Sequence, residues 1–404
     1  MQENICVDIL IDKCLKLYNL EYNDVENRVH EETIDKIVQR VNDVLSIPIV
    51  SSNDVKERQY KIKNYQSILT HLLCKPKVEQ RTKEWFDLRA NMITASDLGQ
   101  SLGEGKFGSV AQVIKKKCGY EEESAFSHYI PPLKWGCMFE PIATDIYSKR
   151  MKTRVHEFGI IQHPSISHFG ASPDGITDEG IMLEIKCPYK RKITGEIPQQ
   201  YYYQIQGQLE VCDLDECDYL ECGFSKYEDE NMFYKDESYP YEQGIIIEYS
   251  KQNEDNPKPY YLYSDILCYD EEGNYLISGK RMKNRDRLRD WEKEKKEGLL
   301  KDATVNKEAG IFIHYWKLEI FNTIRVYKDK DFITQKLEDL SKVWEKIQRY
   351  KMDKDLYVQE MCAKKQRISK VAKLDIEREK EKEKEKEKEI GKGRDIYIFQ
   401  SDSD

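Results

Sequence analysis

The 404-residue sequence lacks the features of a membrane protein or a secreted protein. No apolar run reaches about 18 residues, the length that predicts a membrane span. The N-terminus, MQENICVDILIDKCLKLY, has no basic stretch followed by an apolar block, so we predict no signal peptide. The eleven cysteines are scattered without the framework of a small secreted protein. We therefore expect a soluble, intracellular protein with reduced cysteines and no membrane partner.

An excess of positive charge is also lacking. The formal net charge of -9 means that the average surface does not attract nucleic acid. Nucleic-acid binding depends on local patches more than on the total charge, so a DNA partner is not excluded. The seven histidines form no close pair of metal ligands. The chain does have 39% hydrophobic residues, enough for a core, and 34% charged residues, which is above the usual share.

The sequence pattern divides the chain into three parts. Residues 1–75 predict a helical N-terminal extension with apolar stripes at helical spacing. Residues 76–350 alternate strand and helix patterns, which predicts a mixed α/β layer fold, with an insert at about 227–310. Residues 351–404 pass from a helical pattern to a low-complexity tail, REKEKEKEKEKE, which we expect to be disordered.

The stretch GASPDGITDEGIMLEIKCPYK, residues 170–190, predicts a hairpin whose second strand carries charges inside an apolar run. Glu184 and Lys186 are two positions apart, so they share one face of a strand while Leu183 and Ile185 face away. Asp174 lies across the tight turn, within reach of that face. Burying these groups costs several kcal/mol each unless they pair or bind a cation.

Two interpretations of these three residues remain open. A structural salt bridge explains Glu184 and Lys186, but it leaves Asp174 without a reason. A divalent metal explains all three, because two carboxylates with backbone carbonyls and water form the oxygen cage that Mg²⁺ or Mn²⁺ prefers. Such a metal lowers the pKa of bound water and polarises a phosphate. Lys186 would then position that water.

Five ordered motifs surround this hairpin, namely WFDLRANMITAS, WGCMFEP, SPDG, LEIKCP and YYYQIQGQLEV. Together they resemble the YqaJ-like viral recombinase family, a relative of lambda exonuclease within the PD-(D/E)xK nuclease superfamily. The resemblance covers roughly residues 77–225, and more weakly a segment near residue 350. It implies a restriction-endonuclease-like fold, in which a mixed central sheet is flanked by helices.

The resemblance implies roles for the residues that match the family motifs. Asp174 and Glu184 match the metal carboxylates, with the Ile185 carbonyl as a further ligand. Lys186 matches the catalytic lysine, and Glu140 matches an acid that reaches the metal site. The ion implied is Mg²⁺, with Mn²⁺ as the alternative.

A second set of matched residues implies a pocket for a 5′-terminal phosphate. Arg89, Ser96 and Ser172 match that pocket, and Gln204 matches the glutamine beside it and near the catalytic residues. The physical chemistry agrees, because an arginine fork binds phosphate bidentately and hydroxyls add neutral donors. Each residue also has a plain structural interpretation, as a surface arginine, a helix cap, a turn former or a core amide.

Other sequence patterns give weaker evidence about function. The evenly spaced Cys212, Cys217 and Cys222 are similar to the iron-sulfur cysteines of related nucleases, but a cluster needs four thiolates. Buried core cysteines are the alternative. The basic clusters at 115–117, 190–192 and 280–289 could follow a DNA backbone or could be solvated faces.

The resemblance implies a metal-dependent exonuclease that degrades linear double-stranded DNA from 5′ to 3′ and leaves 3′ overhangs for recombination or repair. It also implies a single-strand annealing partner and a homo-oligomer, often a trimer. A structure-specific or iron-sulfur nuclease is one alternative, and a non-catalytic module that binds DNA ends is another. The expected source is a large DNA virus or a eukaryotic parasite, so the protein would work in the host cytoplasm or nucleus if it is viral.

Overall fold

The structure is a computed structural model that describes most of the chain. The described residues are 6–17, 28–45, 49–80, 82–105, 108–120, 130–236, 239–252, 258–270, 275, 278–363, 378–379 and 382–383. Residues 28–30 and 278–283 are described by their backbone only. The contacts divide the chain into two compact units, Met1–Trp344 and Glu345–Asp404. The expected low-complexity tail lies almost entirely outside the described residues.

The N-terminal region is helical, as the sequence predicts. Its helices are α1 (Val7–Leu17), α2 (Arg28–Leu45) and α3 (Ser52–Leu73). The apolar stripe of α2 is buried through Ile34 and Ile37, which share a small core with α1 and α3. Helix α3 begins at a capping box in which Ser51 and Asp54 satisfy each other's backbone N–H groups.

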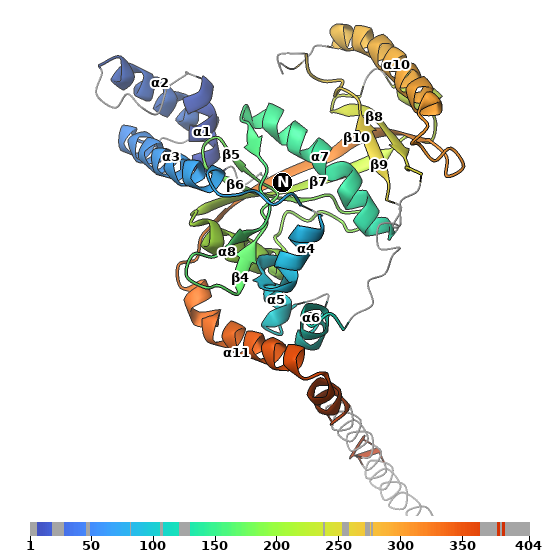
Figure 1. The fold of residues 1–404 in the computed structure, drawn as a ribbon. Helices are drawn as coiled ribbons and strands as arrows, with labels where there is room; N and C mark the ends of the chain where they lie inside the picture. Colours follow the sequence, from blue (N-terminus) through green and yellow to red (C-terminus); the bar gives the residue numbers. More distant parts are fainter. Residues whose placement is uncertain are drawn as a thin grey trace, which may run out of the picture. The chain divides into compact units, whose positions relative to one another are not determined.

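A seven-stranded mixed sheet forms the centre of the first unit (Figure 1). Its strands in spatial order are β2 (Val155–His156), β5 (Gly175–Thr177), β6 (Met182–Lys186), β7 (Glu216–Lys226), β10 (Phe312–Tyr327), β8 (Gln243–Tyr249) and β9 (Tyr260–Tyr263). Strands β6 and β7 are parallel, and every other neighbouring pair is antiparallel. The predicted mixed sheet is therefore confirmed.

Two long helices cover opposite faces of this sheet. Helix α7 (Pro131–Met151) starts with a proline in its first turn and runs through Pro141, and its buried residues pack against Leu183 and Ile185 (Figure 1). Helix α8 (Gln199–Cys212) follows Pro198 and packs against the other face. Because side chains alternate along a strand, Glu184 and Lys186 of β6 point towards α8. The predicted flanking helices are thus present.

A smaller three-stranded sheet and four short helical segments lie beside α8. The strands are β1 (Ile93–Thr94), β4 (Phe169–Ala171) and β3 (Ile161–Gln162), with β1 parallel to β4. The helical segments are α4 (Lys83–Ala90), the 3₁₀ helix η1 (Ala95–Asp97), α5 (Leu98–Ser101) and α6 (Val110–Lys117). An added Cβ at Gly207 of α8 would lie 3.1 Å from Ala95, Leu98 and Phe169. The glycine therefore lets α8 pack closely on this layer.

The insert extends the main sheet. It contributes β8, β9, α9 (Glu230–Lys235) and α10 (Ser278–Lys301), with a core of its own that includes Phe233, Ile247 and Leu288. Strand β10 pairs with β7 along one edge and with β8 along the other. The chain then continues into α11 (Phe332–Met352). None of the described helices combines the length and the apolar character needed to cross a lipid bilayer.

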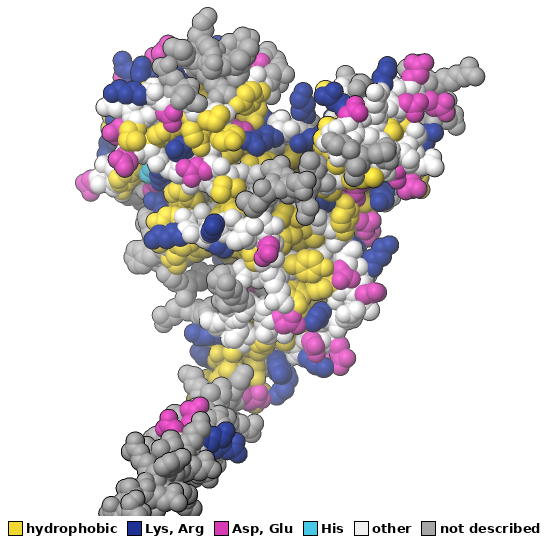
Figure 2. Space-filling model, turned by 180° about the vertical axis from the view of Figure 1, so that it is seen from behind, with side chains coloured by type: hydrophobic (Ala, Val, Ile, Leu, Met, Phe, Trp, Pro, Cys, Tyr) yellow, Lys and Arg dark blue, Asp and Glu magenta, His cyan; other side chains and the backbone are white. Residues whose placement is uncertain are grey.

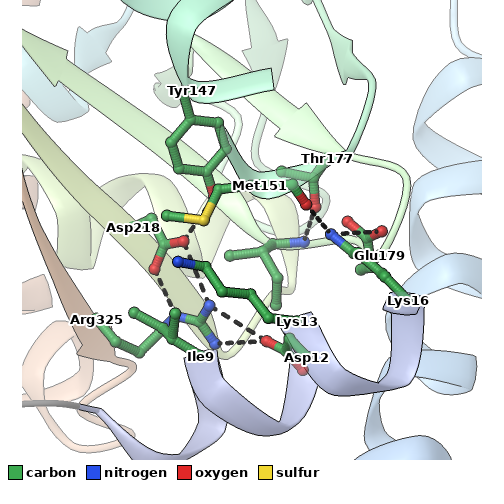
Figure 3. Close-up of a pocket in the computed structure, with 11 residues that line it drawn as sticks. Ile9, Asp12, Lys13, Lys16, Tyr147, Met151, Thr177, Glu179, Asp218 and Arg325 are labelled. Carbon is green, nitrogen blue, oxygen red and sulfur yellow. Dashed lines mark hydrogen bonds and ion pairs between the residues drawn. The ribbon is translucent and has the colours of Figure 1, made fainter. Parts of the chain in front are cut away.

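A buried set of charges joins the N-terminal helices to the sheet, and we call it the ionic cluster. It consists of Asp12 in α1, Arg58 in α3, Glu216 and Asp218 in β7, and Arg325 in β10. Arg58 donates to both carboxylate oxygens of Asp12, at 2.7 and 2.8 Å, and to Glu216. Arg325 donates to Glu216 and Asp218 and approaches Asp12, as Figure 3 shows in part.

The ionic cluster changes the interpretation of residues 1–75. Removing one partner from a buried ion pair costs about 3–5 kcal/mol, so these contacts hold the helices firmly against the sheet. Gly180 adds a close contact in the β5–β6 turn, because its φ of 75° is left-handed and an added Cβ would lie 2.5 Å from Tyr65 of α3. The helices α1 and α3 are thus built into the same unit as the sheet.

Candidate nuclease site

The hairpin formed by β5 and β6 holds the acids and the lysine that the sequence predicts. Asp174 immediately precedes β5, and Gly175 pairs with Leu183 across the hairpin. The backbone N–H of Ile185 donates to Oδ2 of Asp174 at 2.7 Å. The Nζ of Lys186 donates to Glu184 and to the Ile185 carbonyl, the latter at 3.1 Å. The structure therefore brings Asp174, Glu184, Ile185 and Lys186 together; we call this group the hairpin site.

The hairpin site has more carboxylates than positively charged groups. Burial raises the pKa of Asp174 well above its usual range, and the charges of Glu184 and Glu140 raise it further, while Lys186 opposes them. Burial alone would lower the pKa of Lys186, but Glu184 and Asp174 raise it above its ordinary value. Glu140 of α7 thus lies within electrostatic reach of Asp174. The pattern is that of carboxylates that lack enough positive charge.

Gln208 of α8 is a member of this site that the sequence interpretation missed. Its Nε2 donates to Oε2 of Glu184 at 2.8 Å and to the Ser172 carbonyl at 3.4 Å. Gln208 is 1% exposed, and its Oε1 has no hydrogen-bond partner among the described residues. Since Gln208 lies one helical turn after Gln204, helical spacing in YYYQIQGQLEV could have indicated it.

The donor chemistry of the hairpin site fits a hard divalent cation. Asp174 and Glu184 supply carboxylate oxygens, and Ile185 supplies a carbonyl oxygen, which are the ligand types that Mg²⁺ and Mn²⁺ prefer. The raised pKa of Asp174 and the unpartnered Oε1 of Gln208 mark a place that is short of positive charge and of donors. In the described part of the chain, no group of three or more His, Cys, Asp or Glu side chains is arranged to hold a metal ion. The fit therefore rests on two carboxylates and a carbonyl.

The residues predicted to bind a phosphate are assembled next to the hairpin site. The Nη2 of Arg89 donates to Oγ of Ser96 at 3.0 Å. The guanidinium of Arg89 lies 4.4 Å from the ring centre of Trp85, whose Nε1 donates to Oγ of Ser172 at 3.3 Å. Arg89, Ser96, Ser172 and Trp85 thus form a connected set, which we call the Arg89 group. Burial lowers the pKa of Arg89, but an arginine remains charged at neutral pH.

Gln204 lines a polar cavity that connects the two sets of residues. The cavity has a volume of about 110 Å³, and its lining includes Ser96, Gln204 and Tyr201. The ring centre of Tyr201 lies 5.1 Å from Nζ of Lys186. Ser172 provides a second connection, because its carbonyl accepts from Gln208, which also holds Glu184. The cavity, the Arg89 group and the hairpin site are therefore neighbours.

A buried lysine fixes the backbone of Arg89. Lys117 of α6 is 3% exposed, and its Nζ donates to the Arg89 carbonyl and to Asp97, both at 2.7 Å. Burial lowers the pKa of Lys117 to about 8, although Asp97 opposes that change. Burial alone would raise the pKa of Asp97, but Lys117 and Lys116 hold it below its usual range. Neither interpretation of residues 115–117, a cluster that follows a DNA backbone or a solvated face, therefore holds for Lys117, whose ammonium points inwards.

The structure also places the cysteines, the tyrosines and the basic stretch. Cys212, Cys217 and Cys222 are buried free cysteines, and burial raises the pKa of each thiol, to about 12 for Cys212. Of the three adjacent tyrosines at 201–203, Tyr203 is buried. In the basic stretch at 280–289, Arg285 is 7% exposed and donates to backbone carbonyls, so this arginine is structural and not a DNA contact.

Comparison with known proteins agrees with the resemblance. Residues 84–215 match the family model of the YqaJ-like viral recombinase domain. An uncharacterised protein of Acanthamoeba polyphaga mimivirus is 27% identical over 367 residues, which cover 80% of this chain and 62% of that protein. A protein of African swine fever virus is 25% identical over 169 residues, which cover 34% of this chain and 47% of that protein. The chain thus spans less than two thirds of either relative.

Solved structures with a similar arrangement are exonucleases. An alkaline exonuclease from Laribacter hongkongensis has a TM-score of 0.37 and 19% identity, covering 70% of this chain and 99% of that one. A phage-related exonuclease from Haemophilus somnus has a TM-score of 0.31 and 11% identity, covering 68% of this chain and 99% of that one. TM-scores this low carry no argument by themselves. The family match, which includes the whole hairpin site and the Arg89 group, shows that residues 84–215 form a YqaJ-like viral recombinase domain.

Proposed function

We propose that this chain is a metal-dependent nuclease of the lambda-exonuclease type that acts on the ends of linear double-stranded DNA. The observation that supports this most directly is the connection between the hairpin site and the Arg89 group through Gln208, Ser172 and Tyr201. One set of residues is suited to phosphodiester hydrolysis and the other to gripping a terminal phosphate. The family match supports the same class of enzyme.

Asp174, Glu184 and the Ile185 carbonyl would hold the ion, with Glu140 nearby. Bound there, Mg²⁺ or Mn²⁺ would supply Lewis-acid chemistry that activates water and stabilises charge on the scissile phosphate. Gln208 keeps Glu184 oriented through its hydrogen bond to Oε2. The hard-oxygen character of the three ligands favours these ions over softer metals.

Lys186 would orient the attacking water and offset the negative charge of the scissile phosphate. Its ammonium already donates to Glu184 and to the Ile185 carbonyl, and its side chain is 22% exposed. The two carboxylates keep it protonated, so it can donate to a non-bridging phosphate oxygen and hold the attacking water in place. The ring of Tyr201 limits where the Lys186 ammonium can move.

The Arg89 group gives the proposed enzyme its polarity. A 5′-terminal phosphate bound by Arg89, Ser96 and Ser172, with Gln204 alongside, would place the first phosphodiester near the hairpin site. Digestion would then run from 5′ to 3′ and leave 3′ single-stranded overhangs for recombination or repair. The annealing partner, the trimer, and action in the host cytoplasm or nucleus are further parts of this proposal that come from the family resemblance.

The test is digestion of an end-labelled linear duplex, with 5′-phosphate and 5′-hydroxyl ends compared at one salt concentration. We expect cleavage with Mg²⁺, none with a chelator, and a preference for 5′-phosphate ends of roughly tenfold to a hundredfold, because a charge-assisted contact is worth about 1.5–3 kcal/mol. Binding of ends without any metal-dependent cleavage would point to the non-catalytic alternative.

The Arg89→Ala variant tests the polarity separately. It should slow cleavage of the phosphorylated duplex towards the rate of the hydroxylated duplex and leave the latter rate nearly unchanged. Arg154→Ala, which changes an exposed arginine of the same domain, is the matched control and should keep the preference. Equal slowing of both substrates by Arg89→Ala would assign Arg89 to the fold or to general DNA binding.

A further inference from the structure

Beyond the end of β6, basic and aromatic side chains lie in a row that neither the hairpin site nor the Arg89 group uses. We call this row the strip; it consists of Lys190, Tyr189, Trp135, Lys226 and His314. The first two follow β6, and the others lie in α7, at the end of β7 and in β10. Tyr189 is only three residues after Lys186, so the strip begins beside the hairpin site.

Printed contacts join each member of the strip to the next. The Nζ of Lys190 lies 5.3 Å from the ring centre of Tyr189, and that ring lies 5.3 Å from the ring of Trp135. The Nζ of Lys226 lies 5.3 Å from the ring centre of Trp135 and 3.1 Å from Nδ1 of His314. The row is therefore continuous from β6 to β10.

Neither lysine of the strip is neutralised by a carboxylate of the described residues, and although burial lowers the pKa of Lys226 to about 8, it remains mostly protonated at pH 7. Neither Lys190 nor Lys226 forms an ion pair with any described carboxylate, whereas the neighbouring Arg191 is neutralised by Glu221. Both lysines are exposed, and Tyr189 is 40% exposed. On the face of the molecule in Figure 2, acidic and basic side chains are interspersed. Binding of nucleic acid therefore depends on local cations of this kind more than on the net charge.

His314 links Lys226 to Glu248. Its Nδ1 lies 3.1 Å from Nζ of Lys226, and its Nε2 lies 2.9 Å from a carboxylate oxygen of Glu248. Glu248 also accepts from Lys134 at 2.6 Å, which completes its neutralisation. This chain of contacts fixes the direction of the Lys226 ammonium without placing a carboxylate on it.

We propose that the strip binds a single strand of DNA next to the hairpin site, with a base stacked on the exposed ring of Tyr189 and phosphates on Lys190 and Lys226. Trp135 packs against Phe139 and Tyr189, so it supports the Tyr189 ring from the core side. This inference rests on the proposed nuclease function, which makes that strand a substrate or a product. Cations beside an exposed aromatic face are what sequence-independent single-strand binding requires. A duplex keeps its bases stacked on each other, so it would offer no base to Tyr189. Lys226 and His314 lie outside residues 84–215, so the strip depends partly on strands beyond the matched domain.

The test measures equilibrium binding of a fluorescent oligothymidylate and of a duplex of equal length to the full chain in the presence of a chelator. Tyr189→Ala should weaken single-strand binding by roughly fivefold to a hundredfold, the range for one lost base stack. Lys226→Ala should lower the slope of log affinity against log salt by about 0.7, the value for one single-strand phosphate contact. Duplex affinity should change little in both variants, and Tyr189→Phe should bind like the wild type.

Matched controls lie on α3. Tyr60 is 78% exposed and Lys61 is exposed, so Tyr60→Ala and Lys61→Ala change the same residue types away from the strip. If Tyr189→Ala binds single strands as tightly as Tyr60→Ala does, or if it loses duplex and single-strand binding equally, the proposal is wrong. The assay contains no divalent cation and measures no cleavage, so its result is independent of the digestion test.

Discussion

The molecule buries two clusters of charge that differ in their balance. In the ionic cluster, the three carboxylates of Asp12, Glu216 and Asp218 face the two guanidiniums of Arg58 and Arg325. In the hairpin site, Asp174 and Glu184, with Glu140 nearby, share the single ammonium of Lys186. The first cluster uses planar groups that bind two acids at once, and Tyr147 and Tyr65 add donors to it. The second has fewer donors than acceptors.

The difference separates a charge cluster that stabilises the fold from one that is suited to chemistry. A buried carboxylate with a full set of donors is stable and has no remaining affinity for a cation. A buried carboxylate with too few donors keeps its pKa raised, as Asp174 does, and gains free energy when a cation arrives. Composition alone would not distinguish the two clusters, because both consist of acids and bases in the core.

The largest expected effect is on cleavage. Glu184→Gln removes one charge from the hairpin site but keeps the shape of the side chain and an acceptor for Gln208. We expect the metal-dependent digestion of linear duplex to fall on the order of 10³-fold, because the ion loses a carboxylate and its charge is no longer held at the phosphate. The thermal unfolding midpoint should stay the same or rise, since the repulsion with Asp174 is relieved. Cleavage near the wild-type rate would remove Glu184 from the proposed site.

The same substitution in the ionic cluster should have the opposite outcome. Glu216→Gln removes the carboxylate that joins Arg58 to Arg325, and it should lower the free energy of unfolding by about 3–5 kcal/mol. Denaturant titration measures this loss, and the digestion rate of the folded protein should be retained. Glu319→Gln, on the surface of β10, is the control and should cost less than about 1 kcal/mol. A fall in activity without a loss of stability would contradict the division between the two clusters.

A third buried pair, Lys117 with Asp97, tests the comparison by pH. Burial lowers the pKa of Lys117 in the folded state to about 8, against an ordinary value of 10.5. Between these values the unfolded chain binds more protons, so the free energy of unfolding should rise with pH. From pH 7 to pH 9.5, the wild type should gain about 2 kcal/mol relative to Lys117→Met.

Denaturant titrations of both proteins at the two pH values measure that gain. Lys115→Met changes an exposed lysine of the same helix, and its difference from the wild type should not vary with pH. A constant difference between Lys117→Met and the wild type would show that Lys117 is not held with a lowered pKa.

The smallest expected effect concerns two glutamines of α8. Gln208→Leu leaves Oε2 of Glu184 without its donor, and it should raise the Mn²⁺ concentration for half-maximal cleavage about tenfold, as for a lost partner of a metal ligand. Gln206 is the matched control, because its amide is satisfied by the Tyr327 carbonyl and the Asp329 N–H. Gln206→Leu should lower stability without changing the Mn²⁺ requirement. Equal effects of both variants on the Mn²⁺ requirement would make Gln208 a packing residue.

The sequence predicts the hairpin site well because its residues are close along the chain. The two-residue spacing of Glu184 and Lys186 fixes their shared face, and the turn brings Asp174 near them. The mixed sheet, α7 and α8 follow from period and proline position in the same way. The assignment of metal and phosphate roles to these residues stays a prediction, as does the division of the chain at residues 75 and 350.

Features that depend on distant contacts could not be predicted. Nothing near Arg58 indicates Glu216, which lies 158 positions away, so the N-terminal helices looked like an extension. Lys117 stands in a run of lysines that is typical of a solvated face, and only the packing of α6 turns it inwards. Strand β10 begins at Phe312, and its first half pairs with β8 of the insert, which is a contact between distant segments.

Strand β10 also determines when the central sheet can be completed during synthesis. It pairs with both β7 and β8 and carries Arg325 of the ionic cluster. The strand is complete only at Tyr327. Until the ribosome has made that residue, β7 presents an open edge beside the hairpin site, and open edges pair readily with other chains. A nascent chain that stops within the insert would therefore be prone to aggregate and would lack the closed ionic cluster. Completion of the sheet is thus tied to translation of the last of its described strands.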